Sequence, residues 1–359
     1  MKTFRGLVAI FALAACVLAT SVTHAQPVPV NFYAWGGQPA INDYLRWAAR
    51  ELEAEGITLQ HVKVADIAEV VKQITSGRSN ADLIWINGEN FHALKHSDAL
   101  LAVAEKVEGI EHVRTDIGWQ IDFGESVDGL EVPWGIGQFH LLMCGTCVTQ
   151  SSLSTQQLLN YAKANPGRIS YPRPPEFHGT TFLKMLALDL VTDTGVFQKR
   201  TSAVDVESVM RPFWAYLEQL HPHLWQQGEA FPASAAEQLN LFTNAQLHNA
   251  VSFNPNEVLT LANQGRIPAT SKAVMIGDAA ITNSHYLAVP RSAENPEAAI
   301  KVIEFLLSET AQRKKADLQG WGDPAVIQQV EQANLLPAAN DFHVTWHNYL
   351  EKQWAARFH

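Results

Sequence analysis

Cysteine and basic residues are both scarce in this sequence, and low-complexity regions are missing from it. Its 359 residues include 3 cysteines, and 26 lysines and arginines stand against 36 aspartates and glutamates, so the formal net charge at pH 7 is −10 with neutral histidines. A chain of this charge is not expected to bind nucleic acid or an anionic membrane surface. With 47% hydrophobic and 17% charged residues, the composition is that of a globular protein long enough for two domains.

Long apolar runs are absent beyond the first 25 residues. No later stretch approaches the roughly 20 apolar residues that a membrane-spanning helix needs. The N-terminus has Lys2 and Arg5, an apolar run over 7–19 and a small-residue site at 23–25, which is the pattern of a cleavable secretory signal peptide. We expect residues 1–25 to be removed, which leaves a soluble periplasmic protein. Its net charge would be −12, because two basic and no acidic residues are lost.

A lipoprotein anchor is the alternative interpretation of the same N-terminus. Leu13-Ala14-Ala15-Cys16 has the residue types that precede an acylated cysteine, and acylation of Cys16 would tether the protein to a membrane. The apolar run continues for three residues after Cys16, where a lipoprotein signal usually turns polar. Cleavage after residue 25 is therefore the favoured prediction.

The two remaining cysteines form one closely spaced pair, Cys144-Gly-Thr-Cys147. Such spacing occurs both in small-loop disulfides and in thiol oxidoreductases. Redox catalysis needs the first thiol at the start of a helix, whereas this pair follows the strand-like run 139–143. We predict a structural disulfide or two packed thiols, and a secreted thiol-disulfide enzyme is the alternative.

Familiar catalytic motifs are missing as well. The sequence has no Gly-x-Ser-x-Gly or P-loop pattern. Among its 14 histidines, the pair His221 and His223 lacks a partner at the spacing of zinc hydrolases, and His343 with His347 lacks a glutamate next to the first histidine. We therefore predict no enzyme, no metal site and no cofactor, with a secreted metal-dependent enzyme as the alternative.

Strand and helix patterns alternate from residue 31 onward. Strands are predicted at 31–34, 58–64 and 83–86, with helices at 41–52 and 66–75 between them. This order predicts a parallel sheet with right-handed crossovers. In a doubly wound sheet, the loops after the first and third strands flank one crevice.

Both of these loops carry groups that suit a ligand. The tryptophan could stack on a ligand or pack in the core, and the glycines let a ligand approach the backbone. The amides and the carboxylate could fix polar groups, although Asn87 could also only tie its own turn. The candidate ligand-binding residues here are Trp35, Gly36, Gly37, Asn87, Glu89 and Asn90.

A similar arrangement recurs in the second half of the chain. A strand over 168–171 ends at Tyr171, which is a ligand contact or a core residue, and Thr180 and Thr181 open an apolar helix. The free amides of such a helix start suit an anionic or carbonyl group, whereas helix capping is the simpler role for the threonines. The opposite wall of the predicted site consists of Tyr171, Thr180, Thr181, Asn254 and Asn256.

Several motifs together resemble those of a known family. They are Phe32-Tyr33-Ala34-Trp35-Gly36-Gly37, the run Ile84 to Phe91, Asn165-Pro166-Gly167-Arg168 with Tyr171 to Pro175, and Asn295 to Ala299. In this combination the sequence resembles the extracellular solute-binding proteins of ABC importers, most closely the YnjB-type branch, over most of the mature chain. It departs from the family at Met143-Cys144-Gly145, where many members carry a tyrosine that contacts the ligand.

The resemblance implies an α/β fold of the periplasmic-binding-protein type. Two lobes, each a mostly parallel sheet flanked by helices, would be joined by crossing strands near 138–143 and 285–289. The implied lobes are 26–139 plus 286–315 for the N-terminal lobe and 140–285 plus 316–359 for the C-terminal lobe.

The resemblance also implies a function. The protein would be the periplasmic solute-binding component of an ABC importer, a monomer that closes around a small ligand by hinge bending and delivers it to a membrane permease and, through it, to ATPase subunits. A carboxylate at Glu89 beside aromatic residues favours a small organic cation that is thiamine-, polyamine- or choline-like, and a solvated or salt-bridged glutamate is the alternative for this residue. A sugar or an anion is the alternative ligand.

Overall fold

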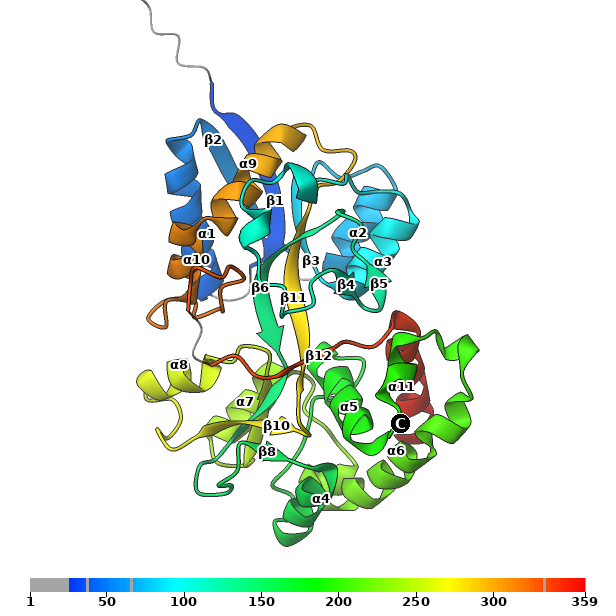
Figure 1. Ribbon diagram of the computed structural model, residues 1–359. Coiled ribbons are helices and arrows are strands. Elements are labelled where there is room, and N and C mark those ends of the chain that lie inside the picture. Colours follow the sequence, from blue (N-terminus) through cyan, green and yellow to red (C-terminus); the bar gives the residue numbers. More distant parts are fainter. Residues whose placement is uncertain (1–25, 37–38, 65–66, 332–333, 359) are drawn as a thin grey trace, which may run out of the picture.

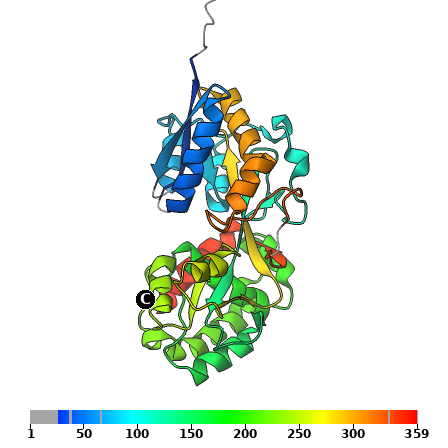
Figure 2. The same ribbon diagram turned by 90° about the vertical axis from the view of Figure 1, so that its left-hand side faces the viewer.

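The computed structural model describes residues 26–36, 39–64, 67–331 and 334–358, without the side chain of Glu89. The predicted signal peptide and Gly37 lie outside this part of the chain. Two α/β lobes are joined by the long strands β6 (Val132–Gln138) and β11 (Ala280–Ala288), which run from one lobe to the other (Figure 1). The view turned by 90° separates the same two bodies (Figure 2).

The N-terminal lobe is built on one sheet with the strand order β12-β11-β3-β1-β2, and β6 pairs with β11. β1 (Val28–Trp35) lies parallel to both β2 (Ile57–Val64) and β3 (Leu83–Ile86), as the alternating pattern predicts. β11 runs antiparallel to β3 and β6. The ends of β1 and β3 therefore meet at one edge of the sheet, at a switch point in the strand order.

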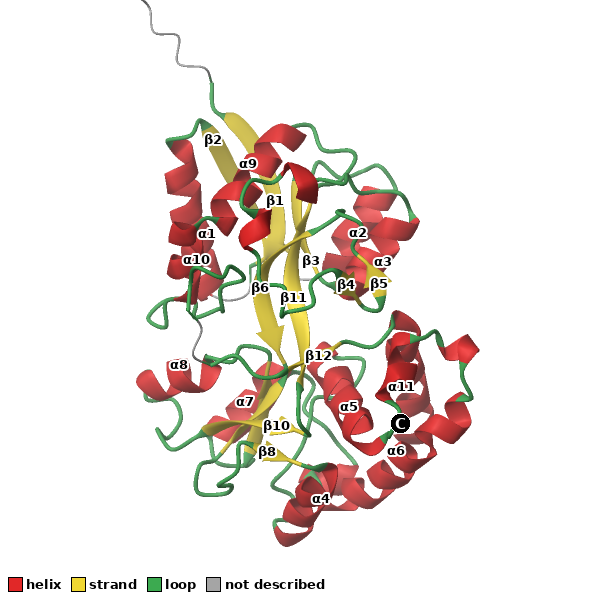
Figure 3. Cartoon of the chain, viewed as in Figure 1, coloured by secondary structure: helices red, strands yellow, loops and turns green. Residues whose placement is uncertain are grey.

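Helices cover both faces of this sheet (Figure 3). In β3, Leu83 and Trp85 pack in the cluster that contains α1 and α9, whereas Ile84 and Ile86 pack in the cluster of α2 and α3. Burial on both faces explains why β3 reads as an uninterrupted apolar run. The helices of this lobe are α1 (Pro39–Glu53), α2 (Ile67–Thr75), α3 (Gly88–His96), α9 (Pro296–Leu307) and α10 (Glu309–Ala316).

The C-terminal lobe has a mixed sheet with the order β8-β10-β7-β9. β7 runs antiparallel to both β10 and β9, so this sheet is not mostly parallel as expected. The reason is that the chain enters the lobe directly from β6 and continues through Phe139 into β7 as one crossing segment. The strands are β7 (His140–Met143), β8 (Ser152–Leu153), β9 (Asn249–Ser252) and β10 (Lys272–Ile276).

Helix starts in the C-terminal lobe follow the sequence signals in part. Ser154 and Gln157 form the capping box expected for α4. α5 begins two residues before Gly179, because Glu176 caps it by accepting a hydrogen bond from the Gly179 amide. The helices of this lobe are α4 (Thr155–Ala164), α5 (Phe177–Leu190), α6 (Val206–Leu220), α7 (Ala235–Thr243), α8 (Glu257–Asn263) and α11 (Val344–Phe358).

Several short elements connect the larger ones. A small hairpin of β4 and β5 projects from the N-terminal lobe toward α11 (Figure 1). β12 pairs with the end of β11 nearest the C-terminal lobe. These elements are β4 (Ile121–Asp122), β5 (Glu125–Ser126), β12 (Ala338–Asn340) and the 3-10 helices Ala104–Lys106, Ile110–His112, Thr194–Gln198, Thr201–Ala203, His221–His223 and Trp225–Gly228.

The chain returns to the C-terminal lobe later than the expected boundary at residue 316. Trp321, Val326 and Val330 all belong to the core cluster of the N-terminal lobe, whereas Phe342 and the buried side chains of α11 belong to that of the C-terminal lobe. The segment from 321 to 330 is therefore part of the N-terminal lobe. Among the described helices, none is both long enough and apolar enough to cross a membrane.

Candidate ligand-binding cleft

A cleft of about 850 Å³ lies between the two lobes. One wall comes from the ends of β1 and β3 and the starts of α1 and α3, and the other comes from the end of β9 and the starts of α5 and α8. β11 and the residues Gly320, Trp321 and Asp323 also contribute to the lining, as does the basic side chain of Arg266. The cleft thus opens at the sheet edge where the strand order places it.

Tryptophans form the wall from the N-terminal lobe. Trp35, Trp85 and Trp321 line the cleft, and their rings pack against one another, with centroid distances of 5.0 Å for Trp35 and Trp85 and 5.7 Å for Trp85 and Trp321. Trp134 is fully buried behind them, 5.0 Å from Trp85. The rings are therefore held in place by a packed aromatic cluster while still reaching the cleft.

Two asparagines stand beside this wall at the start of α3. Asn87 is the residue before the helix, but its side chain does not cap the helix. Instead, its carbonyl oxygen accepts a hydrogen bond from the side-chain amide of Asn90, and both residues line the cleft. Both asparagines thus line the cleft as expected, and their mutual bond is the turn-tying role that the sequence left open for Asn87.

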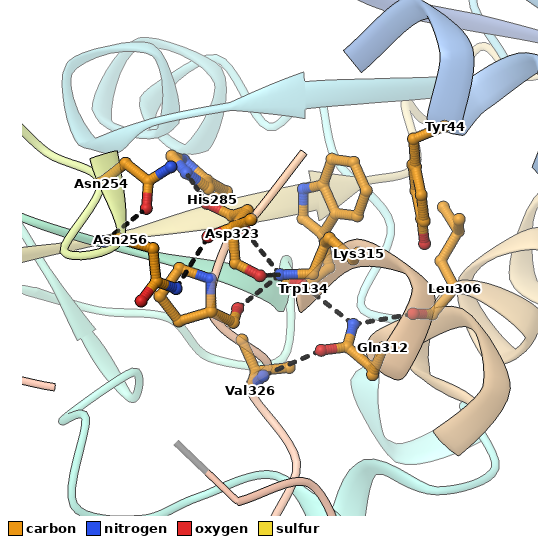
Figure 4. A network of polar contacts seen from close by, with 12 residues as sticks. Tyr44, Trp134, Asn254, Asn256, His285, Leu306, Gln312, Lys315, Asp323 and Val326 are labelled. Carbon is orange, nitrogen blue, oxygen red and sulfur yellow. Dashed lines mark hydrogen bonds and ion pairs between the residues drawn. The ribbon is translucent and has the colours of Figure 1, made fainter. Parts of the chain in front are cut away.

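A buried ion pair supports the third part of the lining (Figure 4). The Asp323 carboxylate lies 2.5 Å from Lys315 Nζ and 3.2 Å from His285 Nε2. Burial would raise the pKa of Asp323, but the charges and hydrogen bonds of Lys315 and His285 outweigh it and lower that pKa. Asp323 is thus ionised, and its charge is largely neutralised by Lys315.

Gln312 holds the segment that carries Asp323 against the N-terminal lobe. Its side-chain nitrogen donates hydrogen bonds to the carbonyl oxygens of Trp134 at 3.0 Å and Leu306 at 2.8 Å, and its oxygen accepts from the Val326 amide at 2.9 Å (Figure 4). Gln312 is fully buried, so these three bonds satisfy an otherwise costly polar group. The position of Asp323 in the cleft is fixed as a result.

Glu176 lies on the opposite wall and is committed to its own lobe. Its carboxylate accepts hydrogen bonds from His178 Nδ1 and the Gly179 amide, both at 2.9 Å. Burial raises the pKa of Glu176, but the hydrogen bond and charge of His178 outweigh burial, so the net change is a lowered pKa. Glu176 therefore serves mainly as the N-terminal cap of α5.

Glu257 is the third carboxylate in the cleft, and its environment differs from that of the other two. Within the described part of the chain, the one hydrogen bond to its carboxylate comes from the Ser252 hydroxyl. Burial raises the pKa of Glu257, and the Ser252 hydrogen bond and the charges of His178 and Arg266, which also line the cleft, offset this only in part. Glu257 is thus the cleft carboxylate with the least compensated charge.

Aromatic rings also face the cleft from the C-terminal lobe. Phe253 and Phe177 stack with a centroid distance of 5.1 Å, and His178 meets Phe253 edge to face at 5.2 Å. All three line the cleft, as does Glu257. A carboxylate beside the faces and edges of aromatic rings is the arrangement that suits an organic cation.

The structure brings together some of the sequence-predicted site residues. Trp35, Asn87, Asn90 and Asn254 line the cleft. Asn256 is buried next to it, where it donates a hydrogen bond to the Gly322 carbonyl oxygen at 2.8 Å. Gly37 and the side chain of Glu89 lie outside the described part of the structure.

Four other candidates are placed away from the cleft lining. Gly36 packs against the side chain of Lys63, and its carbonyl oxygen accepts a hydrogen bond from Asn42. Tyr171 is fully buried, with its hydroxyl bonded to His221 and Trp354 and its ring stacked on Phe182. We therefore correct the expected wall: Tyr171 is a core residue, and its place in the lining is taken by Glu176, Phe177 and His178.

Thr180 and Thr181 are likewise fully buried in the C-terminal lobe. Thr180 donates a hydrogen bond to Glu351 on α11, and Thr181 donates to the Phe177 carbonyl oxygen, both at 2.9 Å. Because α5 starts at Phe177, the two threonines lie past its free N-terminal amides. Thr180 thus links α5 to α11 and Thr181 bonds within α5, so the predicted role of both threonines in the cleft is wrong.

Sequence reasoning missed the residues that line the cleft from outside the two predicted loops. Glu257 belongs to the same polar run as Asn254 and Asn256 after the strand, so its position in the sequence could have identified it. Trp85 lies inside a strand that reads as buried, and Asp323 lies in a segment with no local pattern. Only the folded arrangement places the last two in the cleft.

Cys144 and Cys147 are joined by a disulfide in the turn that follows β7. The Cys147 amide donates a hydrogen bond to the Cys144 carbonyl oxygen at 2.9 Å, which closes the turn. Neither cysteine lines the cleft as described.

Two α/β lobes joined by crossing strands, with a polar and aromatic cleft between them, define a two-lobed ligand-binding protein. The sequence profile of the bacterial extracellular solute-binding proteins matches residues 47–343. The chain belongs to this family, which confirms the resemblance seen in its motifs. A role in solute transport and a periplasmic or extracellular location follow from membership.

The comparisons with individual proteins agree with this assignment. The chain is 35% identical to protein YnjB of Escherichia coli over 377 residues, which cover 98% of this chain and 97% of YnjB. A spermidine/putrescine ABC transporter substrate-binding protein from Streptococcus pneumoniae has a TM-score of 0.63 at 15% identity, covering 92% of this chain and 99% of that one. Iron-bound HitA from Pseudomonas aeruginosa has a TM-score of 0.63 at 16% identity, covering 91% and 99%.

Proposed function

We propose that this protein captures a small organic cation in the cleft and delivers it to the permease of an ABC importer. The observation that carries the proposal is the position of Glu257, a carboxylate that lines a cleft walled by aromatic rings and whose burial is offset only in part by Ser252, His178 and Arg266. A cation is attracted both by the carboxylate and by the ring faces. Thiamine-, polyamine- and choline-like compounds have this character.

The fold alone does not indicate which ligand binds. The two solved structures named above share the architecture at 15% and 16% identity, although one is a substrate-binding protein of a spermidine/putrescine transporter and the other is iron-bound HitA. Our proposal therefore rests on the cleft side chains. Asn87 and Asn90 would hydrogen-bond the ligand from the N-terminal lobe, and Trp35 and Trp85 would cover its apolar part.

Ligand capture would work by closure of the two lobes. β6 and β11 are the strands that cross between the lobes, so a small change in their bend would move one cleft wall toward the other. A ligand that touches both walls favours the closed form by its extra contacts there. The permease would then recognise the closed form, with no bond made or broken by this protein.

The proposal also covers the export, the oligomeric state and the lobe boundaries of the protein. We infer that residues 1–25 act as a cleaved signal peptide and that the mature protein is a periplasmic monomer without enzymatic activity. We place the lobe boundaries as in the sequence analysis, except that residues 316–330 go with the N-terminal lobe because Trp321 to Val330 pack in its core.

A thermal-shift panel tests the proposed ligand class. The mature protein would be heated with putrescine, spermidine, choline and thiamine, and in parallel with a neutral disaccharide and a sulfonate. A ligand present at one hundred times its Kd should stabilise the native protein by about 2.7 kcal/mol. Stabilisation by at least one cation is expected, whereas stabilisation by only the sugar or the sulfonate would refute the proposal.

A further inference from the structure

A second pocket shares none of its lining with the cleft. It has a volume of about 460 Å³. Its lining comes from α3 and the β4–β5 hairpin of the N-terminal lobe and from segments of the C-terminal lobe next to α11; Figure 3 shows how these elements approach one another. Lys95, His96 and Glu125 line it from the N-terminal lobe, and Arg200 and His343 line it from the C-terminal lobe. Its walls are rich in nitrogen and oxygen donors that the proposed transport function does not use.

Three potential metal ligands gather at this pocket. His92, His96 and Glu125 each offer one ligand atom, and these atoms all lie within 4.8 Å of one another. The two histidines are four residues apart on α3, so their side chains lie on the same side of the helix. The hairpin brings Glu125 to them from more than two dozen residues further along the chain.

The separations suit a metal ion after small side-chain rotations. His92 Nδ1 lies 2.8 Å from one Glu125 oxygen, and His96 Nδ1 lies 3.8 Å from the other. In a tetrahedral zinc site with bonds of about 2.1 Å, neighbouring ligand atoms are about 3.4 Å apart, which falls between these values. His96 Nδ1 also donates a hydrogen bond to the His92 carbonyl oxygen at 2.9 Å, and coordination through this nitrogen would replace that bond.

The burial of the three side chains also fits a metal site. The exposed fraction is 11% for Glu125, against 29% for His92 and 52% for His96. The carboxylate is thus shielded from water while the imidazoles stay accessible to an ion from solvent. Two imidazoles and one carboxylate form a ligand set that zinc and related divalent transition metals prefer.

We propose that His92, His96 and Glu125 bind a divalent transition metal ion such as Zn²⁺. Three protein ligands leave a coordination position that opens into the pocket, for water or an exchangeable group. Arg200 faces the same carboxylate from the C-terminal lobe, with its Nη2 at 3.9 Å from a Glu125 oxygen. The metal ion and Arg200 therefore compete for Glu125.

Calorimetric titration tests this site. The purified protein would be treated with EDTA, dialysed and titrated with ZnCl₂ in a non-chelating buffer, alongside His96→Ala, Glu125→Gln and Arg200→Ala. One equivalent of Zn²⁺ should bind the parent protein. Loss of a direct ligand should weaken binding at least about 100-fold, because even outer-shell partners contribute 10- to 100-fold. Arg200→Ala should tighten binding, since it removes the competing positive charge.

A matched control separates this site from general histidine binding. His112 is exposed, and its Nε2 lies 3.9 Å from a carboxylate oxygen of Glu111. It is not one of the three clustered residues at the pocket. His112→Ala should bind Zn²⁺ as the parent does, and circular dichroism would establish that each variant is folded. Absence of binding to the parent, or equal affinity in the parent, His96→Ala and Glu125→Gln, would overturn the proposal.

Discussion

At the scale of single residues, the three cleft carboxylates illustrate how neighbours decide what a charge can do. Asp323 faces Lys315, and Glu176 caps α5 and bonds His178. Glu257 has the Ser252 hydroxyl as its hydrogen-bond partner among the described residues. The same type of side chain is therefore structural at two positions and available to a ligand at the third.

Replacement of Glu257 by glutamine should weaken the binding of a cationic ligand. A hydrogen bond to a charged group contributes about 1.5–3 kcal/mol, which corresponds to a loss in affinity of about tenfold or more. Isothermal titration with the best cation of the panel would measure it. Glu218→Gln, on the exposed side of α6, is the control and should leave affinity unchanged. Equal affinities for Glu257→Gln and the parent would remove Glu257 from the site.

A pair of buried acidic residues outside the cleft should make the stability of the protein depend on pH. Asp122 and Glu131 are both buried, and burial raises the pKa of each. The charge of Asp341 raises the pKa of Asp122 further. The charge of Asp122 in turn raises the pKa of Glu131. Lys184 offsets the shift at Asp122 only in part. Between the unfolded and the raised folded pKa values, the native state binds more protons than the unfolded state. Stability from this pair is therefore present at acid pH and is lost as the pH rises through the folded values.

Glu131→Gln removes one of these titrating groups. The variant should lose part of the fall in stability on raising the pH, so its melting temperature relative to the parent should increase from about pH 4 to about pH 8. Thermal unfolding followed by circular dichroism across this range would measure the difference. A difference that stays constant, or that decreases with pH, would show that the pair does not titrate as described.

At the scale of elements, the sequence patterns located the first strands and helices well. The apolar run at 83–86 is β3, and the stripe of Ile41, Leu45 and Leu52 is the buried face of α1. Periodicity succeeds there because each element has a definite pattern of burial. The helix-start signal was misleading at Thr180 and Thr181, whose hydroxyls indicated a later start for α5. The residue that caps α5 is Glu176, three residues before Gly179.

The proposed metal site illustrates the same limit. In the sequence, His92 with His96 has the same four-residue spacing as His343 with His347, so spacing alone does not distinguish the two pairs. What distinguishes the pair of His92 and His96 is Glu125, which the β4–β5 hairpin brings to it. A contact between distant segments of this kind has no local signal in the sequence.

The start of α3 should not tolerate a side chain at Gly88. A Cβ atom there would lie 1.9 Å from the ring of Phe123, which is buried in the turn between β4 and β5. Gly88→Ala should therefore displace that ring and destabilise the protein by about 1–3 kcal/mol, measured by urea unfolding. Gly320→Ala is the matched control, because its nearest contact would be an ordinary 3.5 Å. Equal stability of Gly88→Ala and the parent would contradict this packing.

At the scale of the whole molecule, the resemblance predicted two lobes with crossing strands, and the structure has them. It could not predict how the segment after α10 is divided between the two lobes, because Trp321 and Val326 join the N-terminal core only through contacts with residues distant in sequence. Nor could local patterns identify Trp85 as a cleft residue. The ends of β1 and β3 were predictable because strand order fixes where they meet.

Ligand binding should make the molecule more compact. If the cleft closes by bending at β6 and β11, a saturating cation from the panel should lower the radius of gyration measured by small-angle X-ray scattering. The non-binding compounds of the same panel serve as controls. An unchanged radius of gyration in the presence of a ligand of proven affinity would argue against closure and would favour a rigid binding role.

The most direct test of the proposed function is native mass spectrometry of the protein gently purified from its native host. A fraction of the molecules should carry one small nitrogenous cation, and this adduct should be lost in Glu257→Gln and kept in Glu218→Gln. A sugar or an anion as the retained molecule, or a cation that Glu257→Gln retains equally, would contradict it.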